Sequence, residues 1–174
     1  MQGGQAPTQA EFHEAISQRA DRWFAACLKI TRSRELAEDA VQEALLSAWN
    51  KRDQFNHASR LDTWIHRIAI NAALQLLRKN KPQNFDSLDF EVVDDSDSQE
   101  DDRLSEELSE SLSSALSHLT DVERICFVLK HLEQWTLREI AEDLNTNIGT
   151  VKQALFRGCR KLRTRMPALQ GGTS

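Results

Sequence analysis

The chain has 174 residues, with 22 Lys and Arg against 27 Asp and Glu, and a formal charge of −5 at pH 7. This length suits one domain or two small ones, and 40% hydrophobic with 28% charged residues is typical of a soluble globular protein. No apolar run approaches the roughly 18 residues of a membrane-spanning helix, and the first residues lack the basic start and apolar segment of a signal peptide. We therefore expect no membrane insertion. At face value, the negative charge argues mildly against a nucleic-acid partner.

The charge is distributed unevenly along the chain. Residues 1–83 carry 12 basic and 9 acidic side chains, residues 84–112 carry 1 and 12, and residues 113–174 carry 9 and 6. The regional charges are therefore +3, −11 and +3, and the last 31 residues contain no acidic side chain. This pattern predicts two mildly basic modules joined by an acidic connector.

The first module is predicted to form helices near residues 10–31, 34–51 and 60–80, because apolar residues recur there at helical spacing. In the second helix, the apolar stripe comprises Ala37, Val41, Ala44, Leu45 and Ala48. The opposite face carries Glu38, Asp39, Gln42 and Leu46, with Trp49 at its edge. Such a face fits either a solvated surface with one stray leucine or a docking surface for a partner helix. The residues alone leave both possibilities open.

The third helix has a polar face rich in arginine and amide side chains. Its buried stripe is predicted to comprise Leu61, Ile65, Ile68, Ala72 and Leu76. The polar face holds Arg60, Arg67, Asn71, Gln75 and Arg78, with Trp64 beside them. This combination suits a surface that follows the backbone of a single nucleic-acid strand and stacks its bases. It also fits a plain polar helix face whose tryptophan leans into the core.

Residues 84–103 form the acidic connector, and Pro82 just before them marks a helix end. Low hydrophobicity and a block of like charges prevent such a segment from burying enough apolar surface to fold. It is predicted to be a flexible linker. Alternatively, it is an acidic strip that occupies a positively charged groove on a partner.

The second module contains the pattern of a helix-turn-helix. Thr136 and Glu139 form a capping box, which predicts a short helix over residues 137–144 whose Ile140, Ala141 and Leu144 face inward. A turn then leads into a helix over residues 148–166, with Thr146 or Asn147 as its cap. In a helix-turn-helix, the second helix enters the DNA major groove.

The long second helix of this motif has a basic face with a phenylalanine in its middle. Its core stripe is predicted to comprise Val151, Leu155, Gly158 and Leu162. The opposite side carries Lys152, Gln153, Phe156 and Arg160, flanked by Arg157. A phenylalanine there is unfavourable in water but useful against a thymine methyl group or a sugar. The alternative is a generic cationic surface helix.

Neither the cysteines nor the histidines are spaced as metal ligands. Cys27, Cys126 and Cys159 form no CxxC pair and are predicted to be small core residues in a reducing cytoplasm. No glycine-rich phosphate loop or nucleophile elbow is present. We therefore expect no metal, no cofactor and no enzymatic activity.

Taken together, three stretches of the chain resemble the extracytoplasmic-function (ECF) subfamily of bacterial RNA polymerase sigma factors. AEDAVQEALLSAW resembles the helix that docks on the clamp of the polymerase's largest subunit, and LDTWIHRIAINAALQLLR resembles the helix that opens promoter DNA. TLREIAEDLNTNIGTVKQALFRGCRKL resembles the family's helix-turn-helix. With the surrounding helices, the resemblance covers nearly all of residues 10–166.

The resemblance implies a role for the candidate residues on each of three surfaces. Polymerase contacts would be made by Asp39, Gln42, Glu43 and Leu46. The minus-ten element and its unpaired strand would be bound by residues just before Leu61 together with Arg60, Trp64, Arg67, Asn71 and Arg78. The minus-thirty-five element would be read by Lys152, Gln153, Phe156, Arg157 and Arg160. The chain departs from the family pattern at Gln75, where members often have Asp, and at Gln153, where a small residue is usual.

The resemblance also implies an architecture and a set of partners. We expect an all-α protein of two small helical domains: a region 2-like domain over residues 10–82 and a region 4-like helix-turn-helix domain over residues 105–168. Residues 83–104 would form the acidic linker, and residues 1–9 and 169–174 would be disordered. Core RNA polymerase and promoter DNA would be the partners, and an anti-sigma factor would hold the protein inactive.

A self-standing helix-turn-helix repressor or activator is the rival interpretation. It explains the second module equally well. It does not explain the Asn71 helix or the clamp-like helix of the first module.

Overall fold

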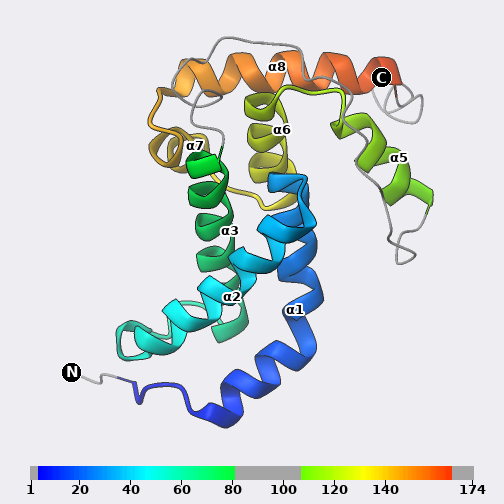
Figure 1. Cartoon of the computed structure of the whole chain (residues 1–174). Helices are drawn as coiled ribbons and strands as arrows, with labels where there is room; N and C mark the ends of the chain where they lie inside the picture. The colour runs from blue at the N-terminus through cyan, green and yellow to red at the C-terminus, as the bar shows by residue number, and fades with distance from the viewer. Residues whose placement is uncertain (1–3, 81–106, 166–174) are drawn as a thin grey trace. The chain divides into compact units, whose positions relative to one another are not determined.

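The computed structural model of the chain describes residues 4–80 and 107–165, the first four residues of the second range by their backbone alone. Every regular element within these ranges is a helix, as Figure 1 shows. The chain divides into two compact units, residues 1–80 and residues 81–174. The expectation of an all-α protein with two small helical domains is confirmed. The predicted acidic linker, residues 83–104, and the predicted tail, residues 169–174, lie outside the described residues.

The first unit is a bundle of three long helices that all pack on one another. They are α1 (Gln9–Thr31), α2 (Arg34–Asn50) and α3 (Leu61–Asn80), with a short 3₁₀ helix, η1 (Arg52–Gln54), after α2. On α1, the buried side of the helix includes Trp23, Cys27 and Ile30. The Cys27 thiol donates a hydrogen bond to the carbonyl oxygen of Ala69 at 3.4 Å, which links α1 to α3 inside the core.

Residues 4–8, which lie in the predicted disordered N-terminus over residues 1–9, make local contacts at the start of α1. Thr8 caps α1: its side chain accepts from the Glu11 amide at 3.2 Å, and the Glu11 carboxylate accepts from the Thr8 amide at 2.8 Å. Pro7 is buried, and the Gln5 carbonyl oxygen lies 3.2 Å from Nε2 of His57. Because a capping box and a buried proline fix this segment locally, residues 4–8 form a defined lead into the helix.

The buried stripe of α2 consists of alanines. Ala37, Ala40, Ala44 and Ala48 are all 1% exposed or less. Val41 and Leu45, which were predicted for this stripe, are only half-buried, so the stripe lies partly elsewhere on the helix. Small side chains let the axis of α2 approach its neighbours closely, and the larger aliphatic residues then pack at the flanks of the contact.

The buried side of α3 is also displaced from its predicted position. Ile65 and Ala72 are buried as expected, but Leu61, Ile68 and Leu76 are only half-buried. The residues that complete the core are Ala69, Ile70, Ala73, Leu74 and Leu77. Because α3 packs against both α1 and α2, it buries a wider arc than a single stripe.

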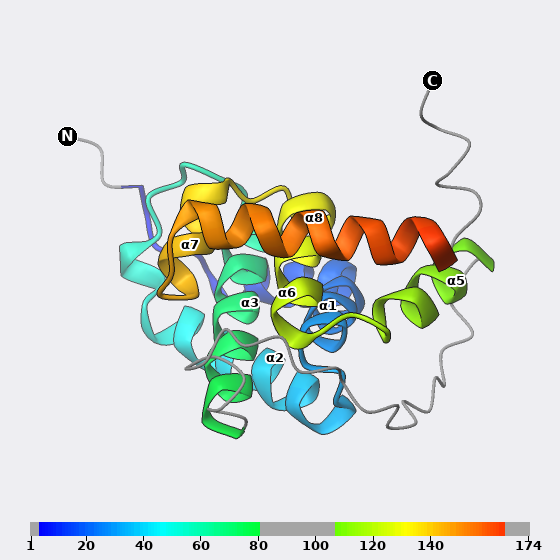
Figure 2. The ribbon, with the colours of Figure 1, turned by 90° about the horizontal axis from the view of Figure 1, so that it is seen from above.

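The described part of the second unit, residues 107–165, contains four α-helices and one π-helical turn. They are α5 (Glu107–Leu116), α6 (Asp121–Phe127), the π-turn η2 (Val128–Leu132), α7 (Leu137–Asp143) and α8 (Ile148–Arg165). The long helix α8 packs across α6 and α7, and it also contacts α5 (Figure 2). The core between these helices is formed by Leu119, Ile125, Leu129, Ile140 and Leu162.

Side-chain caps define the starts of α6, α7 and α8. Thr136 and Glu139 form the predicted capping box at α7, and Thr120 and Glu123 form a second one at α6. For α8, Asn147 is the cap, because its Oδ1 accepts from the Thr150 amide at 2.8 Å. The helix pair α7–α8 therefore begins and ends within one residue of the predicted bounds.

Candidate nucleic-acid interface

Four polar and apolar side chains on α2 form the first candidate surface. Asp39, Gln42, Glu43 and Leu46 are all exposed, and Leu46 is 66% exposed although it is a large aliphatic residue. Because the alanine stripe holds the opposite side of α2 in the core, these residues project away from the bundle. An exposed leucine surrounded by carboxylate and amide groups suits a docking surface for a protein partner.

Trp49 borders this surface and is fixed by two neighbours that the sequence analysis missed. The ring of Phe12 meets it edge-on, with 5.1 Å between ring centroids. The guanidinium carbon of Arg52 lies 4.0 Å from the Trp49 ring centroid, and the same guanidinium donates to the Trp49 carbonyl oxygen at 2.7 Å. Trp49 is still 37% exposed, so it presents a fixed aromatic edge beside Leu46's helix face.

The polar face of α3 forms the second candidate surface. Arg60 is exposed, and Trp64, Arg67, Asn71 and Arg78 are half-buried on the side that the core does not use. Asp62 organises the start of the helix, since its carboxylate lies 3.1 Å from Nε of both Arg60 and Arg19. The predicted residues therefore share one partly open face of α3.

Trp64 belongs to an aromatic cluster at the start of α3. Its ring centroid lies 5.1 Å from that of Phe55, which is buried, and the Phe55 centroid lies 4.6 Å from that of His57. His57 has a φ of 60°, a left-handed conformation that non-glycine residues adopt rarely. Trp64 thus packs against the loop before α3 and stays partly accessible. Its position is intermediate between a tryptophan on an open base-stacking surface and one that leans into the core.

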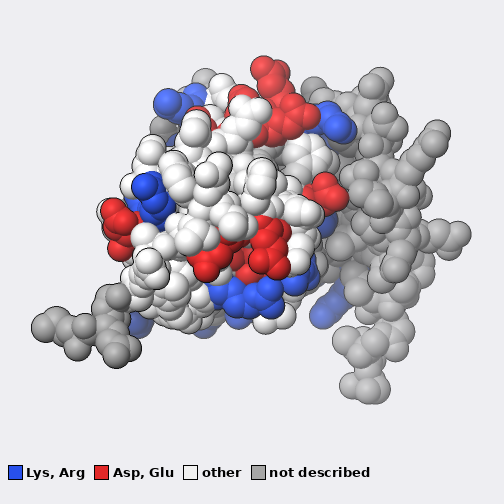
Figure 3. Space-filling model, turned by 90° about the horizontal axis from the view of Figure 1, so that it is seen from below, with Lys and Arg blue, Asp and Glu red and all other residues white. Residues whose placement is uncertain are grey.

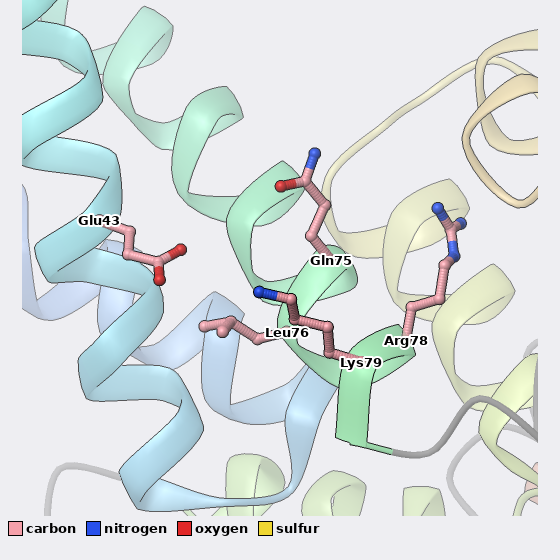
Figure 4. Close-up of a pocket in the computed structure, with 5 residues that line it drawn as sticks. All are labelled: Glu43, Gln75, Leu76, Arg78 and Lys79. Carbon is pink, nitrogen blue, oxygen red and sulfur yellow. The ribbon is translucent and has the colours of Figure 1, made fainter.

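A pocket of about 370 Å³ lies between the two candidate surfaces. Glu43 of α2 lines it together with Gln75, Leu76, Arg78 and Lys79 of α3. In Figure 4, Leu76 and Lys79 point toward α2, whereas Gln75 and Arg78 point along the other side of α3. The structure therefore brings together one predicted polymerase contact, Glu43, and one predicted DNA contact, Arg78.

The third candidate surface lies on α8. Lys152, Gln153, Phe156 and Arg160 are exposed, and Arg157 is half-buried beside them. Phe156 is 65% exposed, and the Arg160 guanidinium carbon lies 5.8 Å from its ring centroid. The opposite side of the helix carries the buried residues Val151, Ala154, Gly158 and Leu162. Ala154 takes the core position predicted for Leu155, which is half-buried.

The turn between α7 and α8 is built from short-range contacts. Asn145 has a φ of 55°, which asparagine tolerates better than most residues. The Thr146 amide donates to the Ala141 carbonyl oxygen at 2.9 Å, which closes the end of α7. Asn147 then caps α8, so the second helix starts at a defined angle to the first.

Burial keeps two of the thiols protonated. It raises the pKa of Cys126 to about 12, with the nearby Glu123 carboxylate acting in the same direction. Burial also raises the pKa of Cys159, against an opposing effect of Arg163. A thiol with a raised pKa is a poor nucleophile and a poor metal ligand, so both side chains are suited to packing.

Neither a metal cluster nor a membrane helix is found in the described ranges. No group of three or more His, Cys, Asp or Glu side chains in residues 4–80 and 107–165 is placed to hold a metal ion. Within the same ranges, no helix is long and apolar enough to cross a membrane. On the face drawn in Figure 3, acidic and basic side chains are intermixed among uncharged ones. The sign of the charge therefore varies over short distances.

The two units match two domains of one protein family. Residues 16–83 match the model of sigma-70 region 2, and residues 109–162 match that of sigma-70 region 4. The ECF RNA polymerase sigma factor SigW of Bacillus subtilis is 32% identical over 170 residues, which cover 91% of this chain and 90% of SigW. The chain belongs to the ECF sigma factors. It therefore acts with RNA polymerase in promoter-directed initiation of transcription.

Further comparisons agree with this assignment. The ECF RNA polymerase sigma-E factor of Haemophilus influenzae is 30% identical over 147 residues, covering 79% of this chain and 78% of that protein. The fold is shared with the sigma factor RpoE of Bartonella quintana, solved with the anti-sigma factor NepR, at a TM-score of 0.57 and 23% identity. That match covers 90% of this chain and 97% of RpoE. CnrH, solved with the cytosolic domain of CnrY, matches at a TM-score of 0.53 and 19% identity, covering 95% of this chain and 92% of CnrH.

Proposed function

We propose that this sigma factor divides its work among the three surfaces described above. The α2 face, comprising Asp39, Gln42, Glu43 and Leu46, binds the clamp of the polymerase's largest subunit. The α3 face, comprising Arg60, Trp64, Arg67, Asn71 and Arg78, binds the minus-ten element. The α8 face, comprising Lys152, Gln153, Phe156, Arg157 and Arg160, binds the minus-thirty-five element. The observation that carries this proposal is that all three sets lie on open or half-open helix faces within the matched regions.

The chemistry of each surface supports its assigned partner. The α2 face combines carboxylates with the exposed Leu46, which suits a protein groove with basic and apolar groups. The α3 face combines arginines with Asn71 and the partly accessible Trp64, which suits stacking and backbone contacts to an unpaired strand. On α8, the exposed Lys152 and Arg160 suit contacts to phosphates, while the exposed Phe156 suits a contact to a thymine methyl group or a sugar.

Two tethered units would share the binding energy. Each unit then needs only modest affinity for its own DNA element, since the tether raises the effective concentration of the second contact. The acidic linker, residues 83–104, would lie in a basic channel of the polymerase. The protein would act in the cytoplasm without enzymatic activity of its own, and would need no metal or cofactor.

An anti-sigma factor would control this protein by covering its polymerase-facing surfaces. The solved complex of RpoE with the anti-sigma factor NepR supports this part of the proposal by analogy of fold. Leu46 and the edge of Trp49 are the exposed apolar groups on the α2 surface that a protein inhibitor would cover.

Separate binding assays test the division of labour. Arg157→Ala should weaken binding of the holoenzyme to the upstream element and leave the association with core polymerase unchanged. Arg157 is half-buried on α8, in the unit that the proposal assigns to DNA. Loss of core-polymerase association in this variant would contradict the proposal.

A further inference from the structure

Glu123 of α6 is almost fully buried and makes a close ion pair with the DNA-facing helix α8. Its side chain is 1% exposed, and its Oε1 lies 2.7 Å from Nζ of Lys161, whose side chain is 40% exposed. The two residues are 38 positions apart in the sequence, so this contact joins two helices of the unit. A buried carboxylate needs a partner, because leaving it without one costs several kcal/mol.

The same carboxylate also caps its own helix. Oε1 of Glu123 accepts a hydrogen bond from the Thr120 amide at 3.0 Å, and the Thr120 hydroxyl accepts from the Glu123 amide at 3.2 Å. The capping box fixes the position of the carboxylate relative to α6. Because the carboxylate is held in place, Lys161 is bound at a fixed point and not by a mobile surface group.

The backbone of α8 approaches this point within one helical turn of Lys161. A Cβ atom built on Gly158 would lie 3.7 Å from both the Cβ atom and the carbonyl oxygen of Glu123. Glu123 thus pairs with α8 through its carboxylate at Lys161, and α8 passes close to the Glu123 backbone at Gly158. The ion pair and this close approach, three residues apart on α8, restrain both the distance of α8 from α6 and its rotation about its own axis.

The rotation of α8 decides which side chains face the DNA. Phe156 is exposed on the helix face away from Gly158, so a small rotation at Gly158 moves the Phe156 ring sideways. Base contacts tolerate little displacement, because their hydrogen bonds and van der Waals contacts are short. Contacts to phosphates by flexible lysine and arginine side chains tolerate more.

We propose that Glu123 is a positioning residue for promoter recognition: through Lys161, it sets the orientation of α8 and thereby the preference for the correct minus-thirty-five sequence. This inference rests on the proposed function of α8. It assigns to Lys161 a role in orientation, although a lysine on a basic DNA-binding helix would ordinarily be expected to contact phosphate.

The decisive variant is Glu123→Gln. Glutamine keeps the capping box with Thr120, since both Glu and Gln serve at that position, but it removes the charge that holds Lys161. The measurement is binding of the reconstituted holoenzyme to two duplexes: a promoter mapped by its transcription start site, and the same promoter with a shuffled minus-thirty-five element. The ratio of the two affinities is the sequence preference.

We expect Glu123→Gln to lower this preference about fivefold, on the scale of one lost base contact, with an unchanged salt dependence. Lys161→Arg should retain the preference within about twofold, because the guanidinium can still pair with the carboxylate. Thr120→Ala serves as the control for stability. It removes the hydroxyl that accepts from the Glu123 amide but keeps the backbone amide that donates to the Glu123 carboxylate, so it should lower the thermal midpoint and leave the preference in place.

Two results would overturn the proposal. If Glu123→Gln strengthens binding to both duplexes equally and steepens the salt dependence, Glu123 only neutralises a lysine that is otherwise free to bind phosphate. If the folded variant keeps the wild-type preference, the ion pair does not orient α8. Lys161→Met provides the second variant should Glu123→Gln fold poorly. A wild-type holoenzyme without any preference would instead contradict the proposed function of α8 itself.

Discussion

The indole of Trp64, at the start of α3, packs against the ring of Phe55 with 5.1 Å between centroids and 39° between ring planes. Phe55 is buried at 6% exposure, and its ring centroid also lies 4.6 Å from that of His57. The tryptophan proposed to meet the minus-ten element is therefore held by the loop that precedes its own helix. This support gives a preformed aromatic surface, which lowers the entropic cost of binding a base.

Phe55→Leu should impair promoter opening. Leucine keeps most of the apolar volume but loses the ring contact to Trp64, which is worth about 1 kcal/mol for a typical aromatic pair. We expect the open-complex equilibrium to fall about threefold to fivefold, on the same scale. The fraction of open complex is measured by the permanganate reactivity of unpaired thymines. Phe24→Leu, which removes a half-buried ring elsewhere in the same unit, is the matched control and should leave opening unchanged.

Leu46→Ala should weaken association with core RNA polymerase. Leu46 is 66% exposed, so truncation costs little stability, but a central apolar contact of an interface commonly costs tenfold or more in affinity. Titration of labelled core polymerase with the variant gives the dissociation constant. Gln18→Ala, at an exposed position on α1, is the control. An unchanged dissociation constant for Leu46→Ala would place the polymerase contact elsewhere.

Asn71→Ala should reduce promoter opening more than formation of the closed complex. The Asn71 amide can donate to and accept from an unpaired base. In the intact duplex, the pairing edges of the bases are already occupied by the opposite strand, so this contact forms only after opening. Closed-complex binding is measured at low temperature, and opening by permanganate footprinting at higher temperature. Thr63→Ala, at an exposed position of the same helix, is the control. Equal losses in both steps would remove the single-strand role.

Phe156→Ala should weaken recognition of the minus-thirty-five element. Because the ring is 65% exposed, its removal should change the free energy of unfolding by less than about 0.5 kcal/mol. The loss of an apolar contact to a base should lower affinity for the intact element by about tenfold. Thr164→Ala, at an exposed position near the end of α8, is the control. An affinity unaffected by Phe156→Ala would argue for a merely cationic surface.

Thiol labelling should follow burial. At pH 8, Cys126 is protonated in the folded chain because burial and Glu123 raise its pKa to about 12, so thiolate chemistry there is suppressed. Cys27 is buried as well, and Cys159 is half-buried. We expect iodoacetamide to label Cys159 first, and Cys27 and Cys126 only after unfolding in urea. Peptide mass spectrometry identifies the labelled cysteines at each time. Labelling of Cys126 in the folded chain would contradict the packing of α6.

The helix bounds could be predicted because their determinants are local. The residue pair Thr136 and Glu139 predicted the start of α7, and the structure confirms the capping box. The same signal is present at Thr8 and Glu11, at the start of α1, which helical periodicity had predicted near residue 10. Capping depends on residues three positions apart, so it needs no knowledge of the tertiary structure.

The buried faces were predicted less well because they depend on which neighbour a helix meets. On α2, Ala40 lies in the core where Val41 was expected, and on α8, Ala154 replaces Leu155. In both cases the smaller residue is fully buried, whereas hydrophobicity alone favours the larger one. Contacts between distant residues, such as Glu123 with Lys161, leave no periodic signal in a single sequence.

Promoter-specific run-off transcription tests the central claim most directly. The purified chain is added to core RNA polymerase with a template library, and the 5′ ends of the transcripts are mapped. We predict transcripts from discrete start sites that share an upstream and a minus-ten element and that depend on the chain. Leu46→Ala should reduce all of them, whereas Phe156→Ala should reduce those with the strongest upstream element. Sequence-specific DNA binding by the chain alone, with no start sites that depend on it, would contradict the account and favour a self-standing helix-turn-helix regulator.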